Sequence, residues 1–431
     1  MFSIAIHEIG HLVPAKKFGV KVSQYMIGFG PTLWSKVRGE TEYGIKAIPL
    51  VGFIRILGMF PPRKGGPLSE EELEILRESR TWKARMTVLI EQSRAEALSE
   101  LNEAEQDRAF YRLSAPKKIV VMFGGPFMNL VLASILFAIA LSGIGESQIT
   151  TKISGVVPCI PSKENPEGIS SVDGGCGAGV HTPAHKLGLQ AGDIIEEING
   201  KPIVNWEDIS LSLNNTAGNS VLIKFVRNGQ QSSGRVEIAA YDRPIYDEQG
   251  KATDATERVS FLGVQPQFEY VTDPISTVPG FIWQQSVDVV KAIAGFPAGV
   301  VDVGDSLVTD APRDEDGFVS IIGVGQMSSS LASSTDVTLK DKVSSFIWLM
   351  ASLNMFLFLF NLVPILPLDG GHIAGAIYEG LRKVLARLRR KPDPGPVDTA
   401  KMMPVAYVAG VFLISMSLVV MLADIFKPIS F

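Results

Sequence analysis

Residues 119–141, IVVMFGGPFMNLVLASILFAIAL, decide the fold, because they run for 23 residues without a charge. A helix needs about 20 consecutive apolar residues to cross a hydrocarbon core of roughly 30 Å. Two more uncharged runs meet this requirement, 25 residues at 343–367 and 20 at 404–423. Three such runs rarely coincide in a soluble domain. The sequence therefore predicts a multi-pass α-helical membrane protein.

The composition of the whole chain agrees. Its 431 residues are 46% hydrophobic but only 20% charged, and the mean hydropathy is +0.22. Ordinary soluble proteins carry about 25% charged residues. These figures exclude a disordered chain and a disulfide-dense scaffold. The net charge of −5 gives no basic field for nucleic acid.

The beginning of the chain is too short to span a membrane. Residues 1–6 are apolar, His7 follows, and charge returns at Lys16 and Lys17. No basic segment or cleavage site indicates a signal peptide. We expect a truncated first transmembrane helix here, with its other residues upstream of Met1.

Charge in the loops predicts the orientation. Residues 16–118 carry 18 Lys and Arg against 13 Asp and Glu, residues 144–342 carry 14 against 26, and residues 368–403 carry 7 against 4. Because basic loops stay in the cytoplasm, we expect four crossings of the cell inner (cytoplasmic) membrane, with residues 144–342 outside. Cys159 and Cys176 fall in that outer segment. A disulfide is plausible there, and two free thiols remain an alternative.

The outer segment changes to short β-branched runs. Residues 221–226 and 235–239 flank Asn228–Gly229, a pattern typical of a β-hairpin. Residues 185–203, HKLGLQAGDIIEEINGKPI, resemble the PDZ domains of bacterial proteases, in which a short helix ends at the first glycine and a Gly-Asp turn opens a strand. We therefore expect an inserted extracytoplasmic PDZ domain, α+β in class and a partly open β-barrel.

PDZ domains bind extended peptides by adding a strand to a sheet edge, and residues 153–157 are the expected edge. The alternative is a domain that only screens the membrane site. Residues 278–301 are apolar but interrupted by Lys291 and two prolines, so we expect them to lie along the membrane surface. Residues 302–316 are acidic and are expected to form a loop.

Residues 7–11, HEIGH, match the HExxH pattern. Positions i and i+4 share a face of a helix, so His7 and His11 can reach one metal ion while Glu8 points to its bound water. Zinc lowers the pKa of that water to about 7, and Glu8 can pass its proton to the leaving amine. The pattern also occurs by chance on surface helices, but such groups in an apolar helix are usually functional.

A zinc peptidase needs a third protein ligand, and residues 12–40 show no pattern that would supply it. Asp369 stands just after the third uncharged run, where Pro364 and Pro367 interrupt the helix. A carboxylate at membrane depth needs a partner or a metal, although a plain helix cap would also explain it. Asp369 is the candidate third ligand, and we expect His372 not to bind the metal.

HExxH in the first membrane helix, together with NLVPILPLDG at 361–370, resembles the site-2 protease family of intramembrane zinc metalloproteases. The chain looks most similar to actinobacterial members with a single PDZ domain. Further shared segments are FGP at 29–31, GIKAIPLVGFIRILG at 44–58 and FGGPFMN at 123–129. The resemblance implies that His7, His11 and Asp369 bind Zn2+ and that Glu8 is the general base.

The resemblance also implies a substrate site beside the metal. The strand-like segment 44–58 would form a membrane-dipping hairpin that holds an unwound substrate as an added strand. A peptide bond inside a helix is shielded, so the substrate must be extended before attack. The candidate substrate-binding residues are Asn361, Pro364, Gly52, Phe53 and Asn129.

These predictions divide the chain as follows. The segments are a truncated first transmembrane helix (1–17), a cytoplasmic β-hairpin region (18–65), a cytoplasmic helical insertion (66–117), a second transmembrane helix (118–143), the PDZ domain (150–268), an outer linker with an amphipathic segment (269–342), a third transmembrane helix (343–371), a cytoplasmic helix and basic loop (372–403) and a fourth transmembrane helix (404–426).

The expected function is proteolysis within the transmembrane segments of single-span regulatory proteins such as anti-sigma factors, after another protease trims their outer part. The active site would face the cytoplasmic side, and membrane lipids are the other expected partners. One alternative is a catalytically inactive membrane scaffold that presents the PDZ domain to extracytoplasmic peptides. Another is a soluble-type zinc protease tethered to the membrane, whose third ligand would not be Asp369.

Overall fold

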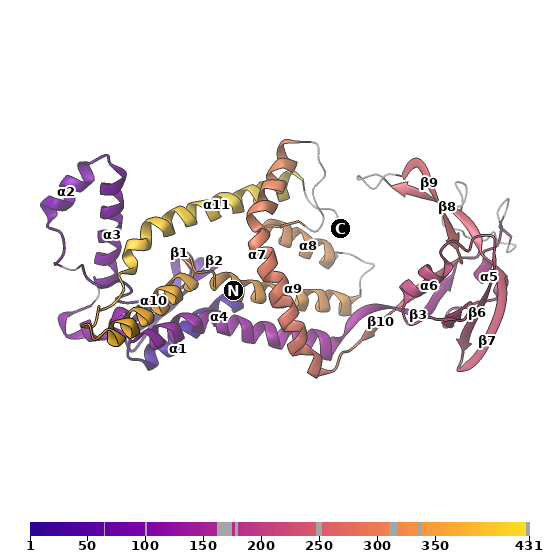
Figure 1. Ribbon diagram of the computed structural model, residues 1–431, viewed down its shortest axis with the longest axis horizontal. Helices are drawn as coiled ribbons and strands as arrows, with labels where there is room; N and C mark the ends of the chain where they lie inside the picture. Colours follow the sequence, from indigo (N-terminus) through magenta and orange to yellow (C-terminus); the bar gives the residue numbers. More distant parts are fainter. Residues whose placement is uncertain are drawn as a thin grey trace. The chain divides into compact units, whose positions relative to one another are not determined.

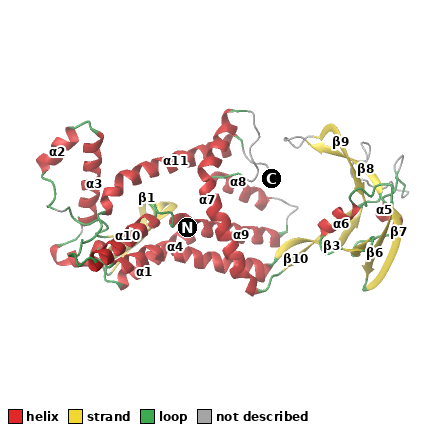
Figure 2. Cartoon of the chain, in the orientation of Figure 1, coloured by secondary structure: helices red, strands yellow, loops and turns green. Residues whose placement is uncertain are grey.

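The computed structural model describes residues 1–63, 65–99, 101–161, 175–176, 180–246, 252–309, 317–333 and 338–427. Within it the chain forms two compact units, one comprising Met1–Ala140 and Pro274–Phe431, the other Leu141–Asp273. The first unit is mainly helical and the second mainly strand (Figure 2). The second unit is therefore an insertion between two halves of the first.

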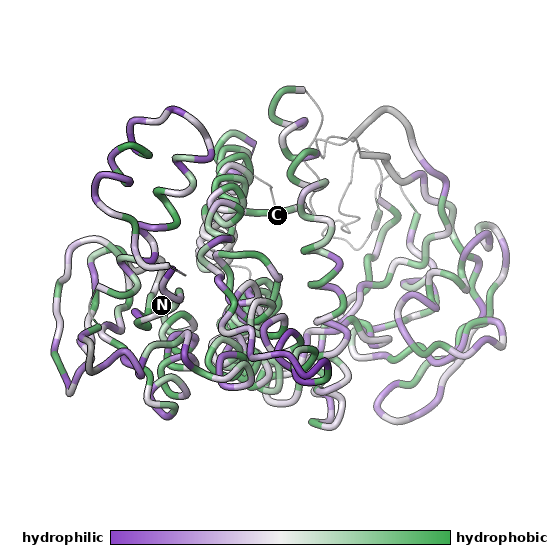
Figure 3. The backbone as a smooth tube through the Cα atoms, turned by 60° about the vertical axis from the view of Figure 1, so that its left-hand side comes forward, coloured by the Kyte–Doolittle hydropathy of each residue, from purple (hydrophilic) through white to green (hydrophobic). Residues whose placement is uncertain are grey.

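Three helical segments of the first unit are long and apolar enough to cross a membrane: Ala115–Ile144, Leu339–Asn361 and Thr399–Phe426. They contain α4 (Ala115–Ala138) with its π-helical extension η3 (Ile139–Ile144), α9 (Leu339–Asn361), and α11 (Met403–Phe426) preceded by η5 (Thr399–Met402). Figure 3 shows apolar residues following one another along helices of this unit. These segments coincide with the three uncharged runs of the sequence. By length and composition, the described residues thus contain three of the four helices that were expected to cross a membrane.

Helix α1 (Phe2–Lys17) packs closely on α4 through glycines (Figure 1). A Cβ atom on Gly10 would lie 2.2 Å from the carbonyl oxygen of Gly124, and one on Gly124 would lie 2.0 Å from the carbonyl oxygen of Gly10. Small residues allow two membrane helices to approach to backbone contact. Helix α9 packs on α4 too, where Ala351 and Met355 meet Phe137. Helix α4 is thus shared by several neighbours.

Strands β1 (Val22–Arg38) and β2 (Thr41–Ile56) form one antiparallel hairpin. The buried side chains near its base, Val22 and Ile56, pack in the same cluster as Leu12 of α1. Farther along β1, Leu33 and Trp34 are exposed. The strand-like segment expected at 44–58 is thus a strand over most of its length, and its partner precedes it in the chain.

The expected third helix over 343–371 is two helices. Helix α9 ends at Asn361, and α10 (Asp369–Leu388) begins after a turn. The turn folds back tightly, because a Cβ atom on Gly370 would lie 2.3 Å from the carbonyl oxygen of Val363, and one on Gly371 would lie 2.6 Å from the nitrogen of Leu366. Proline breaks a helix, and the two glycines then let the chain reverse. Asp369 consequently becomes the first residue of a new helix.

The remaining elements of the first unit are helices. They are α2 (Glu70–Glu78), α3 (Trp82–Leu98), η1 (Glu103–Arg108), η2 (Phe110–Arg112), η4 (Ile275–Thr277), α7 (Val278–Val308) and α8 (Ile321–Ser333). Ser69 begins α2 with a capping box, as its sequence indicates. Helix α7 continues to Val308, so the loop expected at 302–316 is wrong for residues 302–308. Residues 310–316 lie outside the described residues. The acidic stretch is helical because Val300 and Val303, three residues apart, pack against Met416 and Val420 of α11.

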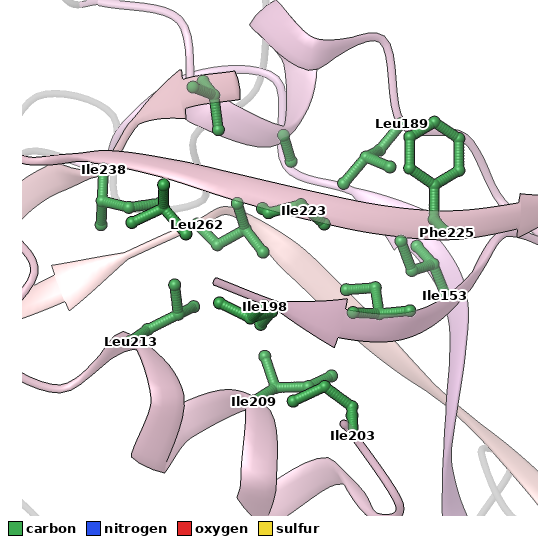
Figure 4. Close-up of a cluster of buried hydrophobic side chains, with 14 residues drawn as sticks. Ile153, Leu189, Ile198, Ile203, Ile209, Leu213, Ile223, Phe225, Ile238 and Leu262 are labelled. Carbon is green, nitrogen blue, oxygen red and sulfur yellow. The ribbon is translucent and has the colours of Figure 1, made fainter. Parts of the chain in front are cut away.

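The second unit is built on an antiparallel sheet in the order β10-β3-β4-β6-β7, with β5 paired to β4 and a separate β8–β9 hairpin. Its strands are β3 (Glu146–Val156), β4 (Ile194–Ile198), β5 (Lys201–Pro202), β6 (Ser220–Arg227), β7 (Gln230–Glu237), β8 (Ala239–Tyr246), β9 (Ala252–Phe261) and β10 (Val264–Val271), and its helices are α5 (Pro183–Leu187) and α6 (Trp206–Leu213). Figure 4 shows the core, in which Ile198, Ile209 and Ile223 come together.

Local turn chemistry is as the sequence predicts. Helix α5 ends at Gly188, whose φ is 73°, and the β6–β7 turn contains Asn228 with φ 51° and Gly229 with φ 81°. Positive φ at both central residues suits the right-handed twist of a two-residue hairpin. Cys159 and Cys176 form a disulfide.

One expectation for the second unit needs correction, and another stays a prediction. The free edge at 153–157 is wrong, because β3 lies between β10 and β4, and the outer strands are β10 and β7. Main-chain pairing with β10 continues along residues that were expected to be available to a peptide. In the described part of the chain no pairing joins β7 to β10, and the expected partly open barrel stays a prediction.

Candidate metal centre

Three side chains from two distant segments converge at the start of α10. His7 and His11 lie one turn apart on α1, and Asp369 is the first residue of α10. The Nε2 atoms of the two histidines are 3.2 Å apart, and each lies 3.3 Å from Oδ2 of Asp369. The three ligand atoms therefore form a nearly equilateral triangle.

This triangle has the dimensions of one face of a zinc coordination tetrahedron. With bonds of about 2.0–2.1 Å, a tetrahedral zinc ion holds its donor atoms about 3.3–3.4 Å apart. Oδ2 of Asp369 is buried, and although both Nε2 atoms lie 3.3 Å away, it has no hydrogen bond of good geometry. This is costly for a carboxylate oxygen unless something else binds it. Two imidazoles and one carboxylate with a fourth position open are also a donor set of catalytic zinc. The residues present fit the metal.

Helix α4 fixes the position of His11. The backbone carbonyl of Val121 lies 2.8 Å from Nδ1 of His11, and a carbonyl can only accept, so Nδ1 carries the hydrogen. Nε2 then carries the free lone pair, and it is the atom that forms a corner of the triangle. A Cβ atom on Gly125 would lie 2.2 Å from that Nε2. The glycine is required because the imidazole occupies the space of its missing side chain.

Glu8 lies between the two histidines in sequence and is buried. Its charge is coupled electrostatically to His7, His11 and Asp369. A Cβ atom on Gly52 would lie 3.2 Å from Cγ of Glu8, so β2 passes directly beside this carboxylate. The structure thus brings Gly52, a candidate substrate-binding residue, to the candidate base.

The other candidate residues are distributed differently. Nδ2 of Asn129 lies 3.1 Å from Nδ1 of His7. Phe53 follows Gly52 on β2, and its ring is 5.5 Å from Nζ of Lys46. Asn361 donates its amide to the carbonyl of Leu357 in its own helix.

Two more residues lie in or after the turn that leads to Asp369. Pro364 is exposed in that turn. His372 is not a member of the described triangle.

Sequence reasoning missed the contribution of α4. The segment FGGPFMN had been singled out by resemblance, but nothing in it shows that Gly124 contacts α1 or that Gly125 makes room for His11. The signal that could have been used is the four-residue spacing of Val121, Gly125 and Asn129. Residues at this spacing share one helix face.

A second group of potential ligands occurs in the other unit. Cys159, Cys176 and His181 have ligand atoms within 4.8 Å of one another. The two sulfur atoms are joined in a disulfide, and a metal binds the thiolate form of cysteine. This group is therefore closed to zinc as long as the disulfide stands.

Comparison with known proteins agrees with the geometry at α1 and α10. The sequence profile of peptidase family M50 matches residues 1–392. The chain belongs to this family. It is the site-2 protease family of intramembrane zinc metalloproteases, so the enzyme class and the zinc cofactor expected from the sequence are confirmed.

Relatives match over almost their whole length. The zinc metalloprotease Rip1 of Mycobacterium bovis BCG is 31% identical over 441 residues, which cover 100% of this chain and 96% of the relative. The zinc metalloprotease Rip1 of Mycobacterium tuberculosis H37Rv is 30% identical with the same coverage. A putative zinc metalloprotease of Clostridium acetobutylicum is 25% identical over 99% of this chain and 95% of that protein. The actinobacterial resemblance is confirmed by the mycobacterial relatives.

Proposed function

We propose that this M50 peptidase holds its zinc ion with His7, His11 and Asp369 and uses Glu8 as the general base. The observation that carries the proposal is the triangle of ligand atoms, with sides of 3.2 to 3.3 Å, formed by residues from opposite ends of the chain. One corner, Oδ2 of Asp369, has no hydrogen bond of good geometry. No other arrangement in the described residues brings two free imidazole nitrogens to a carboxylate in this way.

The residues around the triangle have separate tasks in peptide hydrolysis. Zinc, when bound, supplies the Lewis acidity that brings the pKa of water close to 7. Glu8 accepts the proton of the attacking water and delivers it to the leaving amine. Strand β2 passes Glu8 at Gly52, where a side chain would obstruct the approach. A substrate segment laid beside this strand in extended form would present its peptide bonds next to the base.

The position of Asp369 along α10 supports cleavage at membrane depth. Helix α10 packs on α4, and Nζ of Lys118 lies 2.7 Å from Oε2 of Glu379. Lys118 marks the last charge before the uncharged run of α4. Ten residues of helix, from Glu379 back to Asp369, span about 15 Å. Along α4, Gly125 beside Nε2 of His11 is seven residues, or about 10 Å, beyond Lys118. The triangle would then lie about 10–15 Å inside the level of that ion pair, within the hydrocarbon core.

The proposed topology follows the charge of the loops. Helix α1 would be the first of four crossings of the inner (cytoplasmic) membrane, with the active site toward the cytoplasmic side. The insertion with α2 and α3 and the basic loop after α10 would be cytoplasmic, and the second unit extracytoplasmic. We propose the division of the chain expected from the sequence, with each helix ending where the structure places its end.

We further propose that the second unit is a PDZ domain. The support is the short helix that ends at Gly188, the strand that opens after Asp193 and the Asn199–Gly200 turn that closes it. Strand addition to an exposed edge would use an outer strand, and β10 is one of the two. The competing interpretation is a domain that only screens access to the active site. The two interpretations can be distinguished with a substrate whose outer part has not been trimmed.

The proposed substrates are single-span transmembrane regulators such as anti-sigma factors. They fit a buried site reached by an extended segment within lipid. An inactive scaffold is disfavoured because Glu8 is present and buried beside the triangle. A tethered soluble-type protease would have another third ligand. It is disfavoured because Asp369 forms one corner of the triangle of ligand atoms.

The test is metal analysis of purified wild type, His7→Ala, Asp369→Ala and Glu8→Gln, with a transmembrane reporter and casein assayed in parallel. We expect one zinc ion in wild type and in Glu8→Gln, and loss of zinc in the two ligand variants. Only wild type should cleave the reporter, and casein should stay intact. Retention of full zinc affinity by Asp369→Ala would disprove the ligand set.

A further inference from the structure

One face of α4 supports both histidines from behind. Val121, Gly125 and Asn129 follow each other at intervals of four and so share a face of the helix. The carbonyl of Val121 and the space above Gly125 hold His11. Eight residues beyond Val121, Asn129 meets the Nδ1 atom of His7 at 3.1 Å. The two histidines, one turn apart on α1, therefore use the same face of α4, on which Val121 and Asn129 are about two turns apart.

Zinc binding by His7 sets the protonation of its ring. Nε2 of His7 faces His11 and Asp369, so this nitrogen must offer a lone pair. The hydrogen of a neutral imidazole then sits on Nδ1, which needs an acceptor. In the structure the amide nitrogen of Asn129 faces Nδ1, which would set two donors against each other. Oδ1 of Asn129, meanwhile, is buried and has no partner.

A half-turn of the amide removes this conflict. The oxygen and nitrogen of an Asn side chain have nearly the same shape, and their assignment rests on the hydrogen bonds they make. With the two exchanged, Oδ1 accepts the hydrogen of His7 Nδ1. Asn129 has 1% of its surface exposed, so its amide must find its hydrogen-bond partner between α1 and α4 and not in the surroundings.

We propose that Asn129 is a positioning residue for zinc: its Oδ1 accepts the Nδ1–H of His7 and holds the ring with Nε2 toward the metal. This inference rests on the proposed role of His7 as a ligand. It assigns Asn129 to the ligand rather than to the substrate backbone, which was the expectation from the sequence. Val121 does the same for His11 with a main-chain carbonyl, which substitution cannot remove, so Asn129 is the side chain that can be tested.

The experiment compares two variants of Asn129 with a matched control in the full-length purified protein. Asn129→Leu keeps the number and branching of the side-chain heavy atoms and removes the acceptor, whereas Asn129→Asp keeps the shape and an acceptor. The control is Asn354→Leu, because Asn354 is also fully buried in an apolar helix, and it donates to Ser3 of α1 and to the carbonyl of Met350, neither of which is a proposed ligand. Zinc affinity is measured by competition with a chelator, and the absorption spectrum of the Co2+ form reports the coordination geometry.

We expect Asn129→Leu to weaken zinc binding by about 10- to 100-fold, the range for loss of a hydrogen bond to a metal-bound histidine, and to alter the Co2+ spectrum. Asn129→Asp should stay close to wild type, and so should Asn354→Leu. Wild-type zinc affinity in Asn129→Leu, beside weak binding in His7→Ala, would overturn this inference alone. Equal losses in Asn129→Leu and Asn129→Asp would overturn it as well. Wild-type affinity in His7→Ala would overturn the ligand assignment and this inference together.

Discussion

Substitution of Gly125 by alanine should remove zinc without unfolding the protein. The new Cβ atom would lie 2.2 Å from Nε2 of His11, whereas ordinary contacts begin at 3.4 Å. The ring must therefore move by about 1.2 Å to relieve the overlap. Metal ligands tolerate displacements of only about 0.2 Å. His11 cannot remain a ligand in this variant.

The loss of zinc affinity has a lower bound, and it can be compared with the change in fold stability. Loss of a supporting hydrogen bond to a ligand costs 10- to 100-fold in affinity, so displacement of the ligand itself should cost at least about 100-fold, or about 2.8 kcal/mol. The helix backbone, by contrast, gains up to about 1 kcal/mol when glycine becomes alanine. Overpacking against the buried imidazole opposes this gain by about 1–3 kcal/mol, so fold stability should change less than zinc affinity.

The assay is zinc content across a series of chelator concentrations, with thermal unfolding of the zinc-free protein measured in parallel. Gly410→Ala is the matched control, because α11 leaves open space within 4 Å of that position; its zinc affinity should not change. If Gly125→Ala binds zinc as tightly as wild type, the position assigned to His11 is wrong. If it loses zinc only because the zinc-free form unfolds, the steric argument is wrong.

The remaining predictions concern the supports of the two units. Glu379→Gln leaves the buried ammonium of Lys118 without its carboxylate and should cost about 3–5 kcal/mol, seen as a lower thermal inactivation temperature; replacing both residues by apolar ones should recover most of it. In the second unit, burial raises the pKa of the Asp193 carboxyl, but the Arg227 guanidinium outweighs it and holds this pKa below its ordinary value. The resulting stability is complete above the unfolded pKa of about 4 and is lost as pH falls through the lower folded pKa. Asp193→Asn should therefore speed hydrogen exchange in β4 about tenfold at pH 7, and the difference should close in acid. Ile198→Ala, at a fully buried position, should cost about 2–5 kcal/mol in the second unit; if that unit screens substrates, this variant should cleave an untrimmed reporter with unchanged zinc content.

The sequence was sufficient for the parts of the fold that depend on local patterns. Uncharged length located the three helices that could cross a membrane, and Asn-Gly pairs such as Asn228–Gly229, which favour positive φ, located turns. The spacing of His7 and His11 required one helix face. Asp369 was singled out because a carboxylate after so long an apolar run is unusual. All of these signals lie within one or two elements.

The parts that the sequence did not reveal depend on which faces of different elements meet. Nothing local distinguishes the glycine that meets α1 (Gly124) from the one beneath His11 (Gly125). Strand β3 was expected to be an edge because its later partner, β10, lies more than 100 residues away. The acidic end of α7 was expected to be a loop because its packing on α11 involves another distant partner. In each case the deciding contact is between segments far apart in the chain.

Helix α4 explains how ligands from opposite ends of the chain reach a common geometry. Gly10 on α1 and Glu379 on α10 both contact α4, one through backbone at Gly124 and the other through Lys118. Each histidine also has its second nitrogen within hydrogen-bonding distance of a residue of the same helix. Contacts with one helix, α4, therefore hold the two imidazoles and the carboxylate in place. A substitution on the face of α4 that meets α1 or α10 therefore displaces one ligand relative to the other two, and it should lower zinc affinity more than an equal substitution on a face of α4 that meets neither helix.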